Sequence, residues 1–160
     1  MKKRIEIDLS HQRLRLYSGR SVLREYRVST AAKGPGERNG SNCTPRGRHT
    51  VRAMIGRGAP AGAVFVSRRP TGEVCTGELR ERYPGRDWIL SRILWLSGLE
   101  PGRNRLREVD TMRRYIYLHG TPEETELGKP GSHGCVRMGN ADIVELFDLV
   151  EPGVEVMIHE

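Results

Sequence analysis

The chain has 160 residues, of which 29% are charged and 36% hydrophobic, a composition typical of one globular domain, residues 1–160, rather than a disordered chain. No apolar run approaches the roughly 18–20 residues of a membrane span. The net charge of +7 could attract nucleic acid, an anionic membrane or a carboxylate-rich substrate, but an ordinary solvated surface explains it best.

The N-terminal segment does not have the pattern of a signal peptide. It begins with basic residues, but charged and polar residues interrupt any apolar core within residues 1–19. The cysteines, Cys43, Cys75 and Cys135, are odd in number and form no CxxC pair, which argues against a disulfide framework and favours a reducing compartment. We therefore expect a cytoplasmic protein; a periplasmic location stays open if an export signal has been removed.

Alternating apolar and polar residues predict short strands along the first part of the chain. Their ranges are 4–9, 12–17, 22–28, 49–55 and 63–66. Residues 29–47 form a Gly-rich loop that lacks the spacing of a phosphate-binding loop, and Cys43 in it is expected to be buried and inert. His49 is expected to be a strand residue rather than a catalyst. Residues 68–85 are polar and predicted to be irregular, with no activating partner evident for Cys75.

The second part of the chain combines strands with one clear helix. Residues 87–99 fit a helix or a buried strand, and a structural role is expected for Arg92 within them. A loop over residues 100–110 precedes a predicted strand over residues 114–119, in which two tyrosines and His119 share one face. The pattern as a whole indicates a mainly β domain.

The helix is predicted near the C-terminus, over residues 140–150. Ile143, Leu146 and Phe147 recur there at helical spacing, and Asn140 is a suitable N-cap. A strand over residues 154–158 follows.

One stretch of the chain holds the candidate catalytic groups. Cys135 is a candidate nucleophile, because a thiolate attacks carbonyl carbon and an imidazole can generate it. His133 lies two residues earlier, on the same face of an extended backbone, and His119 lies across a loop long enough to return it to the thiol, so spacing alone leaves two candidate bases. Gly134 leaves backbone N–H groups open to an oxyanion, and Arg137 could hold a substrate carboxylate or form a strand salt bridge.

These residues also carry a resemblance to a known family. The sequence His119-Gly120, a spacer and Ser132-His133-Gly134-Cys135-Val136-Arg137 resembles the signature of the YkuD-type L,D-transpeptidases. Two earlier segments, Val28-Ser29-Thr30 and Thr44-Pro45 with Gly47, resemble a strand end and a turn that flank the substrate cleft in that family. The resemblance covers nearly the whole chain.

The resemblance implies a closed or sandwiched β-fold and favours a strand over residues 87–99. It implies that Cys135 is the nucleophile, that His119 is the base, and that the carbonyl of Gly120 orients its ring, with His133 in a supporting role. No metal or cofactor is expected. The candidate site residues are Cys135, His119, Gly120, His133 and Gly134 for catalysis, and Arg137 and Ser132 for substrate binding.

The family's reaction implies the substrate. Its members attack the bond between the L-centre of a diamino acid and a terminal D-alanine in peptidoglycan stem tetrapeptides, and the thioester is resolved by water or by an amine. We expect water, and hence an L,D-carboxypeptidase of peptidoglycan recycling. The alternative is a periplasmic L,D-transpeptidase that forms cross-links or exchanges D-amino acids. Expected partners are a stem peptide or muropeptide and, as covalent ligands, carbapenem-type β-lactams.

Four other classes are less consistent with the sequence. Sortase-like transpeptidases place their histidine much further upstream of the cysteine. A zinc site built from His119, His133 and Cys135 lacks a clear fourth ligand. A non-catalytic peptidoglycan-binding module would need no thiol. Nucleic acid is not an expected partner, because no binding motif is present and only 6% of the residues are aromatic.

Overall fold

Ten strands form one continuous sheet in the computed structural model, which describes residues 2–160. The strands are β1 Lys3–Asp8, β2 Arg13–Ser18, β3 Ser21–Ser29, β4 Gly47–Ile55, β5 Ala63–Val66, β6 Arg69–Val74, β7 Ile89–Gly98, β8 Tyr117–Gly120, β9 Val136–Met138 and β10 Glu155–His159. Their order is β4-β10-β1-β2-β3-β9-β8-β7-β5-β6, and β4 also pairs with β7. The first eight strands of this order therefore close on themselves, which confirms the closed, mainly β fold.

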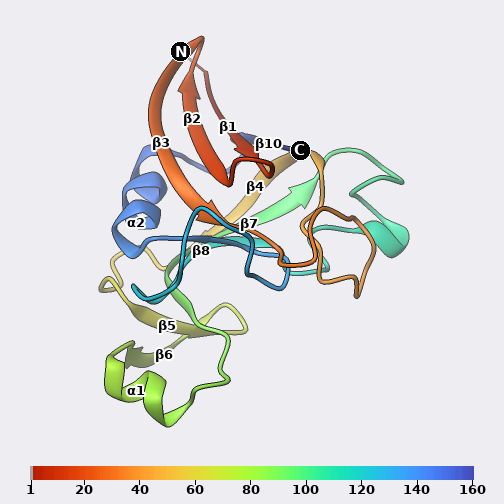
Figure 1. Ribbon diagram of the computed structural model, residues 1–160. Helices are drawn as coiled ribbons and strands as arrows, with labels where there is room; N and C mark the ends of the chain where they lie inside the picture. Colours follow the sequence, from red (N-terminus) through yellow and green to blue (C-terminus); the bar gives the residue numbers. More distant parts are fainter. Residues whose placement is uncertain (1) are drawn as a thin grey trace.

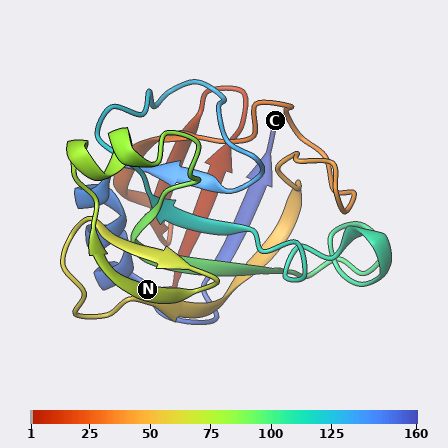
Figure 2. The same cartoon turned by 90° about the horizontal axis from the view of Figure 1, so that it is seen from below.

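The helix α2, Asn140–Leu149, packs against the sheet and contributes to its core, whereas α1, Gly77–Arg82, lies beside the hairpin β5–β6 (Figure 1; Figure 2). A short 3-10 helix, η1, covers Arg107–Val109. The hairpin extends the sheet from the N-terminal end of β7, where Val64 pairs with Leu90.

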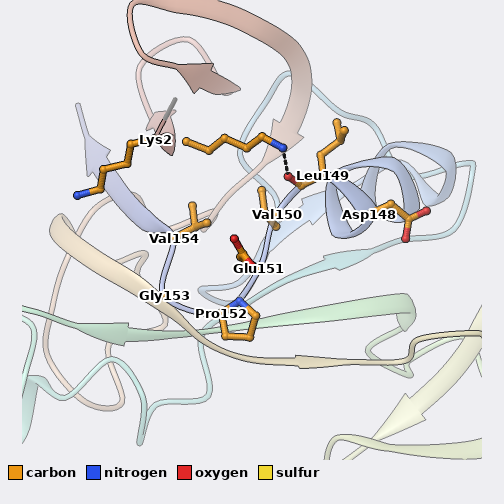
Figure 3. A pocket seen from close by; sticks show the side chains of 9 residues that line it. Lys2, Asp148, Leu149, Val150, Glu151, Pro152, Gly153 and Val154 are labelled. Carbon is orange, nitrogen blue, oxygen red and sulfur yellow. Dashed lines mark hydrogen bonds between the residues drawn. The ribbon is translucent and has the colours of Figure 1, made fainter.

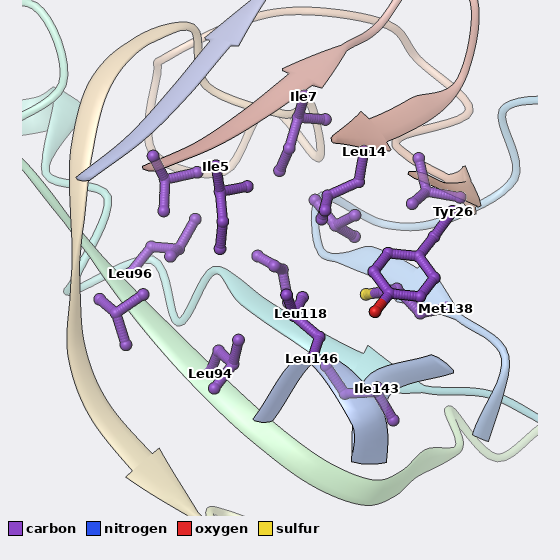
Figure 4. Close-up of a cluster of buried hydrophobic side chains, with 14 of the residues drawn as sticks. Ile5, Ile7, Leu14, Tyr26, Leu94, Leu96, Leu118, Met138, Ile143 and Leu146 are labelled. Carbon is purple, nitrogen blue, oxygen red and sulfur yellow. The ribbon is translucent and has the colours of Figure 1, made fainter. Parts of the chain in front are cut away.

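The core forms because alternate strand residues point into the closed sheet. Ile5 and Ile7 of β1 and Leu14 and Leu16 of β2 are fully buried there, and α2 adds three apolar side chains (Figure 4). Those three are Ile143, Leu146 and Phe147, the residues whose spacing predicted the helix. The same clustering buries the central part of β7, so residues 87–99 contain a strand, as expected.

Two elements within residues 68–85 contradict the expectation of irregular structure. The strand β6 pairs with β5 through a two-residue turn in which Ser67 and Arg68 both have positive φ angles, of 48° and 65°. The helix α1 is capped by the Thr76 hydroxyl, which accepts from Leu79 N–H at 3.1 Å. No residue of α1 is buried, so the sequence lacks the apolar periodicity that reveals a helix. The expected loop over residues 100–110 likewise contains η1.

The strand that carries His119 is shorter than predicted. The strand β8 begins at Tyr117, because Tyr115 has a φ of 56° and ends a hydrogen-bonded turn. Asp110 holds this turn through its side chain, which accepts from Arg113 N–H at 3.0 Å and from Leu106 N–H at 2.6 Å. Tyr115 therefore does not share a strand face with His119.

The N-cap of α2 also differs from the prediction. Gly139 occupies the cap position, and the Asn140 side chain instead makes hydrogen bonds to β7 and to the residue that follows β8. Its amide donates to Thr121 O at 3.1 Å, and its oxygen accepts from the Ser91 hydroxyl at 2.6 Å. Arg92 has the expected structural role, since it is buried and donates to the carbonyl of Ala59 at 2.8 Å. Within residues 2–160, no helix has both the length and the apolarity to cross a bilayer.

His49 in β4 should make the fold sensitive to acid. The ring is fully buried, bonded to Gly47 O and the Thr111 hydroxyl at 3.0 Å each, and burial lowers its pKa from 6.5 to about 4. Between pH 6.5 and 4, His49 therefore binds a proton more readily in the unfolded state than in the folded state. The contribution of His49 to the free energy of unfolding should therefore be complete above pH 6.5, and it should fall by about 3 kcal/mol as the pH drops toward 4.

Urea titrations at several pH values measure this effect. The variant His49→Gln, which cannot titrate, should lose less stability over the same pH interval, whatever its stability at neutral pH. Equal pH slopes in both proteins would assign the acid sensitivity to other groups.

Candidate active site

The strand pair β8–β9 brings the histidine and the cysteine together. The two strands are parallel neighbours, in a register that places His119 opposite Arg137 and Leu118 opposite Val136. Extending this register by one residue places Cys135 opposite Tyr117, two residues before His119 on the same face of the sheet. A parallel pair needs a long connection, which the loop between Gly120 and Cys135 provides.

Cys135 lies partly exposed directly before β9. Its sulfur accepts from Tyr117 N–H at 3.3 Å and lies 3.4 Å from Tyr115 O, and the side chain packs on an apolar cluster that includes Ile93 and Phe65. Burial raises the pKa of the thiol to about 12, against a smaller lowering by the Tyr117 N–H. The thiol is therefore neutral at rest and needs a base in order to attack.

His119 is suited to be that base. It is buried, and its Nδ1 lies 2.6 Å from Gly120 O. A carbonyl oxygen can only accept a hydrogen bond, so Nδ1 carries the proton and donates it. Nε2 is therefore the unprotonated nitrogen, and the ring is held in one orientation. Burial lowers the pKa of His119, and the Arg137 charge lowers it further, whereas the Gly120 carbonyl and Asp87 raise it.

The loop before Cys135 is held by hydrogen bonds that leave little freedom. The Ser132 hydroxyl donates to Cys135 O at 2.6 Å and accepts from Gly134 N–H at 3.1 Å, and the Thr44 hydroxyl donates to Gly134 O at 2.9 Å. Gly134 has a φ of 131°, and a Cβ there would come within 3.2 Å of Cys43 O. The loop conformation thus requires glycine at this position.

This geometry corrects two expectations. Ser132 is buried with its hydroxyl committed to the loop, so it shapes the turn and does not face a substrate. The N–H of Gly134 is also committed, whereas the N–H of Cys135 has no protein acceptor among the hydrogen bonds of residues 2–160. The backbone donor available to an oxyanion is therefore Cys135 N–H.

His133 and Cys135 do not lie on one extended segment. The backbone bends through residues 133–135, because Gly134 has a positive φ, so the extended geometry assumed from the spacing is absent. His133 is exposed, and together with Arg137 and residues 84–88 it lines a cavity of about 210 Å³.

Arg137 makes a contact with an acid and also lines a cavity, so its role as a substrate anchor stays a prediction. Its Nη1 donates to Gly131 O at 3.0 Å, and its Nη2 lies 3.5 Å from the Asp87 carboxylate, a long contact with a half-exposed partner. The guanidinium lines the same 210 Å³ cavity.

Comparisons with known proteins identify the family of the chain. Residues 2–158 match the YkuD family, described as the L,D-transpeptidase catalytic domain. The chain belongs to this family. It is 31% identical over 95 residues to the protein called L,D-transpeptidase YkuD of Bacillus subtilis (strain 168), an alignment that covers 59% of this chain and 48% of that protein. The match thus spans about half the length of that relative.

Two solved structures show the same fold as this YkuD-family domain. An L,D-transpeptidase from Xylanimonas cellulosilytica DSM 15894 is similar with a TM-score of 0.57 and 22% identity, over 99% of this chain and 60% of that chain. The catalytic domain of the E. faecium L,D-transpeptidase acylated by ertapenem is similar with a TM-score of 0.58 and 18% identity, over 99% of this chain and 98% of that chain.

Arg114 is a residue of the YkuD-family site that sequence reasoning missed. Its Nη2 donates to Cys43 O at 2.6 Å and its Nη1 to Gly36 O at 3.2 Å, which holds the Gly-rich loop against Gly134. Burial lowers the pKa of Arg114. Cys43 itself is only partly buried, contrary to expectation, and its thiol contacts Ser41 O at 3.6 Å. No local pattern reveals Arg114, because its partners lie about 70 residues away along the chain.

Asp87 is the second residue that sequence reasoning missed. It lies in the segment between α1 and β7, and its carboxylate is 3.5 Å from Arg137. Its negative charge raises the pKa of both His119 and Cys135. An isolated acid in an irregular segment carries no sequence signal, so only the tertiary contact identifies it.

A second cavity of the YkuD-family domain shares no lining residue with this site. A cavity of about 530 Å³ lies at the C-terminal end of α2, lined by Lys2, Lys3 and residues 148–154 (Figure 3). Lys3 Nζ donates there to Leu149 O at 2.6 Å and so satisfies a terminal carbonyl of the helix.

Among residues 2–160, no group of three or more His, Cys, Asp and Glu side chains is arranged to hold a metal ion. The independence of the reaction from metal stays a prediction.

The pKa shifts predict how the Cys135 thiol reacts with alkylating agents. Burial disfavours charge on both His119 and Cys135, which argues against a thiolate–imidazolium pair at rest. Alkylation of Cys135 by iodoacetamide should accelerate about tenfold per pH unit from about pH 7 to 9, because the thiolate fraction grows in that proportion. Mass spectrometry of the Cys135 peptide measures the rate. A plateau near neutral pH would contradict the neutral pair.

Proposed function

We propose that this domain uses Cys135 to cleave peptidoglycan stem tetrapeptides between the L-centre of the diamino acid and the terminal D-alanine. The observation that supports the proposal best is the placement of His119 beside Cys135 on adjacent parallel strands, with the Nδ1–H of His119 bonded to Gly120 O. Membership of the L,D-transpeptidase family supplies the reaction class.

In the proposed mechanism, His119 takes up and releases a proton twice, once in each half of the reaction. Nε2 takes the thiol proton as Sγ of Cys135 attacks the carbonyl carbon, and Cys135 N–H donates to the resulting oxyanion. The intermediate expels the D-alanine amine, which receives the proton from His119, and a thioester remains on Cys135. Water then attacks the thioester; His119 takes a proton from the water and returns it to the departing thiolate, which releases the tripeptide acid.

Water as the acceptor is the finer part of the proposal. Hydrolysis needs only an open path to the thioester, whereas transfer to an amine needs a second binding groove. The three cysteines are free thiols, as is typical of a reducing cytoplasm, where soluble tetrapeptide fragments rather than a cross-linked wall would be the substrate. The alternative is a periplasmic transpeptidase.

Incubation with a disaccharide tetrapeptide and an excess of acceptor amine tests the acceptor. Tripeptide and D-alanine as the main products, identified by mass spectrometry, would support an L,D-carboxypeptidase. Cross-linked dimer or exchanged D-amino acid as the main product would replace it with the transpeptidase. The absence of any cleavage would refute the proposal as a whole.

Carbapenems test the nucleophile independently of the acceptor. One similar structure is an L,D-transpeptidase acylated by ertapenem, and we propose that ertapenem also forms a covalent adduct with this chain. The adduct should map to Cys135. An adduct only on Cys43 or Cys75 would count against the assignment.

A further inference from the structure

One arginine of the aromatic cluster next to Cys135 is held in place by the rings of that cluster. Arg68 lies at the tip of the hairpin β5–β6, and its guanidinium carbon is 5.0 Å from the ring centroid of Trp95 and 4.6 Å from that of Tyr115. Its Nη1 also donates to the Tyr117 hydroxyl at 2.9 Å. These contacts restrict a side chain that is usually flexible.

Two of these three aromatic residues also hold the Cys135 sulfur. Tyr117 donates its N–H to Sγ at 3.3 Å, and Tyr115 O lies 3.4 Å from it. The side chains of Tyr117 and Cys135 belong to the same cluster, with Trp95 packed on it. Arg68 is therefore connected to the nucleophile through residues that touch both.

The backbone at Arg68 adopts a conformation that its sequence does not favour. The turn has positive φ angles at both Ser67 and Arg68, a geometry for which Asn-Gly is the usual sequence. A side chain in the left-handed region is strained, and such strain persists mainly where neighbouring contacts hold the residue. The contacts that hold Arg68 are those with the aromatic rings.

Arg68 has no carboxylate partner. Within residues 2–160, none of the ion pairs includes it, whereas Arg86 pairs with Glu73 at 2.8 Å and Arg80 pairs with Glu124 at 2.6 Å. Arg137, whose charge acts on the Cys135 thiol, lies 3.5 Å from Asp87. The guanidinium of Arg68 is thus positioned, partly exposed and uncompensated.

We propose that Arg68 binds a carboxylate of the substrate while Cys135 attacks the neighbouring carbonyl. A guanidinium offers parallel N–H donors that match a carboxylate, and a side chain that is already ordered loses little entropy on binding. The identity of the substrate as a stem peptide rests on the proposed function; the recognition of a carboxylate does not. The competing view is that Arg68 only covers the aromatic rings.

Small alkylating agents test carboxylate recognition without any peptide. Iodoacetate carries a carboxylate and iodoacetamide does not, so the ratio of their rates at Cys135 reports an anion site beside the sulfur, whatever the thiolate fraction. Arg68→Met, which keeps an apolar cover over the rings, should lower this ratio about fivefold or more and leave the iodoacetamide rate unchanged. Arg69→Met is the matched control, since Arg69 is the exposed neighbour, and it should keep the wild-type ratio.

An unchanged ratio in Arg68→Met would refute the proposal and leave the covering role. A fall in both rates would also refute it, since that result indicates a disturbed thiol. If Arg68→Met does not fold, as judged by circular dichroism, Arg68→Lys and Arg68→Gln replace it. The lysine variant should then keep more of the preference for iodoacetate than the glutamine variant, and equal ratios in the two would refute the proposal.

Tetrapeptide kinetics then identify the carboxylate. Arg68→Met should raise KM about tenfold with kcat nearly unchanged, because the contact positions substrate and takes no part in proton transfer. Substrates amidated at the D-alanine or at the diamino acid carboxylate separate the sources: the amidated group that removes the difference between variant and wild type is the one that Arg68 binds. An equal KM in variant and wild type would refute the proposal for peptides. If wild type cleaves no tetrapeptide, the proposed function fails, while the alkylation ratio still decides the role of Arg68.

Discussion

The variant Cys135→Ala is expected to lose the cleavage of stem tetrapeptides by at least about 10⁴-fold while keeping its fold. The loss follows because no other side chain near His119 can form the thioester, and the removal of a reacting atom costs a cysteine enzyme most of its rate. The fold should persist, because the side chain is small and partly exposed, so the free energy of unfolding should change by about 1 kcal/mol or less.

Cys43→Ala and Cys75→Ala are the matched thiol controls. Both residues are partly buried free thiols like Cys135, but among the hydrogen bonds of residues 2–160 neither thiol is bonded to the strand that carries His119, as Cys135 is through Tyr117 N–H. Each control should retain activity within about threefold. Full activity in Cys135→Ala, with product release followed by mass spectrometry, would remove the central element of the mechanism.

The second large effect is expected for His119→Ala. This variant removes the base that takes the thiol proton and returns it to the leaving amine, a contribution of about 10²–10⁴-fold in rate. His133→Ala should change the rate by less than about tenfold, because His133 is exposed, whereas the ring of His119 is buried and held by Gly120 O. Wild-type turnover in a soluble, folded His119→Ala protein would transfer the role of base to His133.

The pH profile separates this role from a structural one. Because burial lowers the pKa of His119 below 6.5, the neutral imidazole persists to a lower pH than it would in a free histidine. Activity in wild type should therefore stay high down to about pH 6.5 and fall only below it, as the imidazole becomes protonated. The residual activity of His119→Ala should lack this acid limb.

The sequence by itself determined the local features of this protein. Alternation of apolar residues is sufficient to define most strands, and a 3.6-residue period defines α2, because each pattern reflects which side chains of one segment face the core. The motif around Cys135 could also be recognised, since the residue types of a thiol nucleophile and its base are few. Gly134 stands there because only glycine tolerates the φ of 131° and the close approach of Cys43 O.

The tertiary structure alone decided which groups act together. Whether His119 or His133 is positioned as the base depends on the parallel pairing of β8 with β9 and on the bend at Gly134, and neither is visible in a local pattern. The same is true of Arg68 and Asp87, which reach the site from segments 50 or more residues before Arg137 along the chain. These contacts carry no periodic signal, because a single charged side chain in a turn looks the same in sequence whether it faces water or a nucleophile.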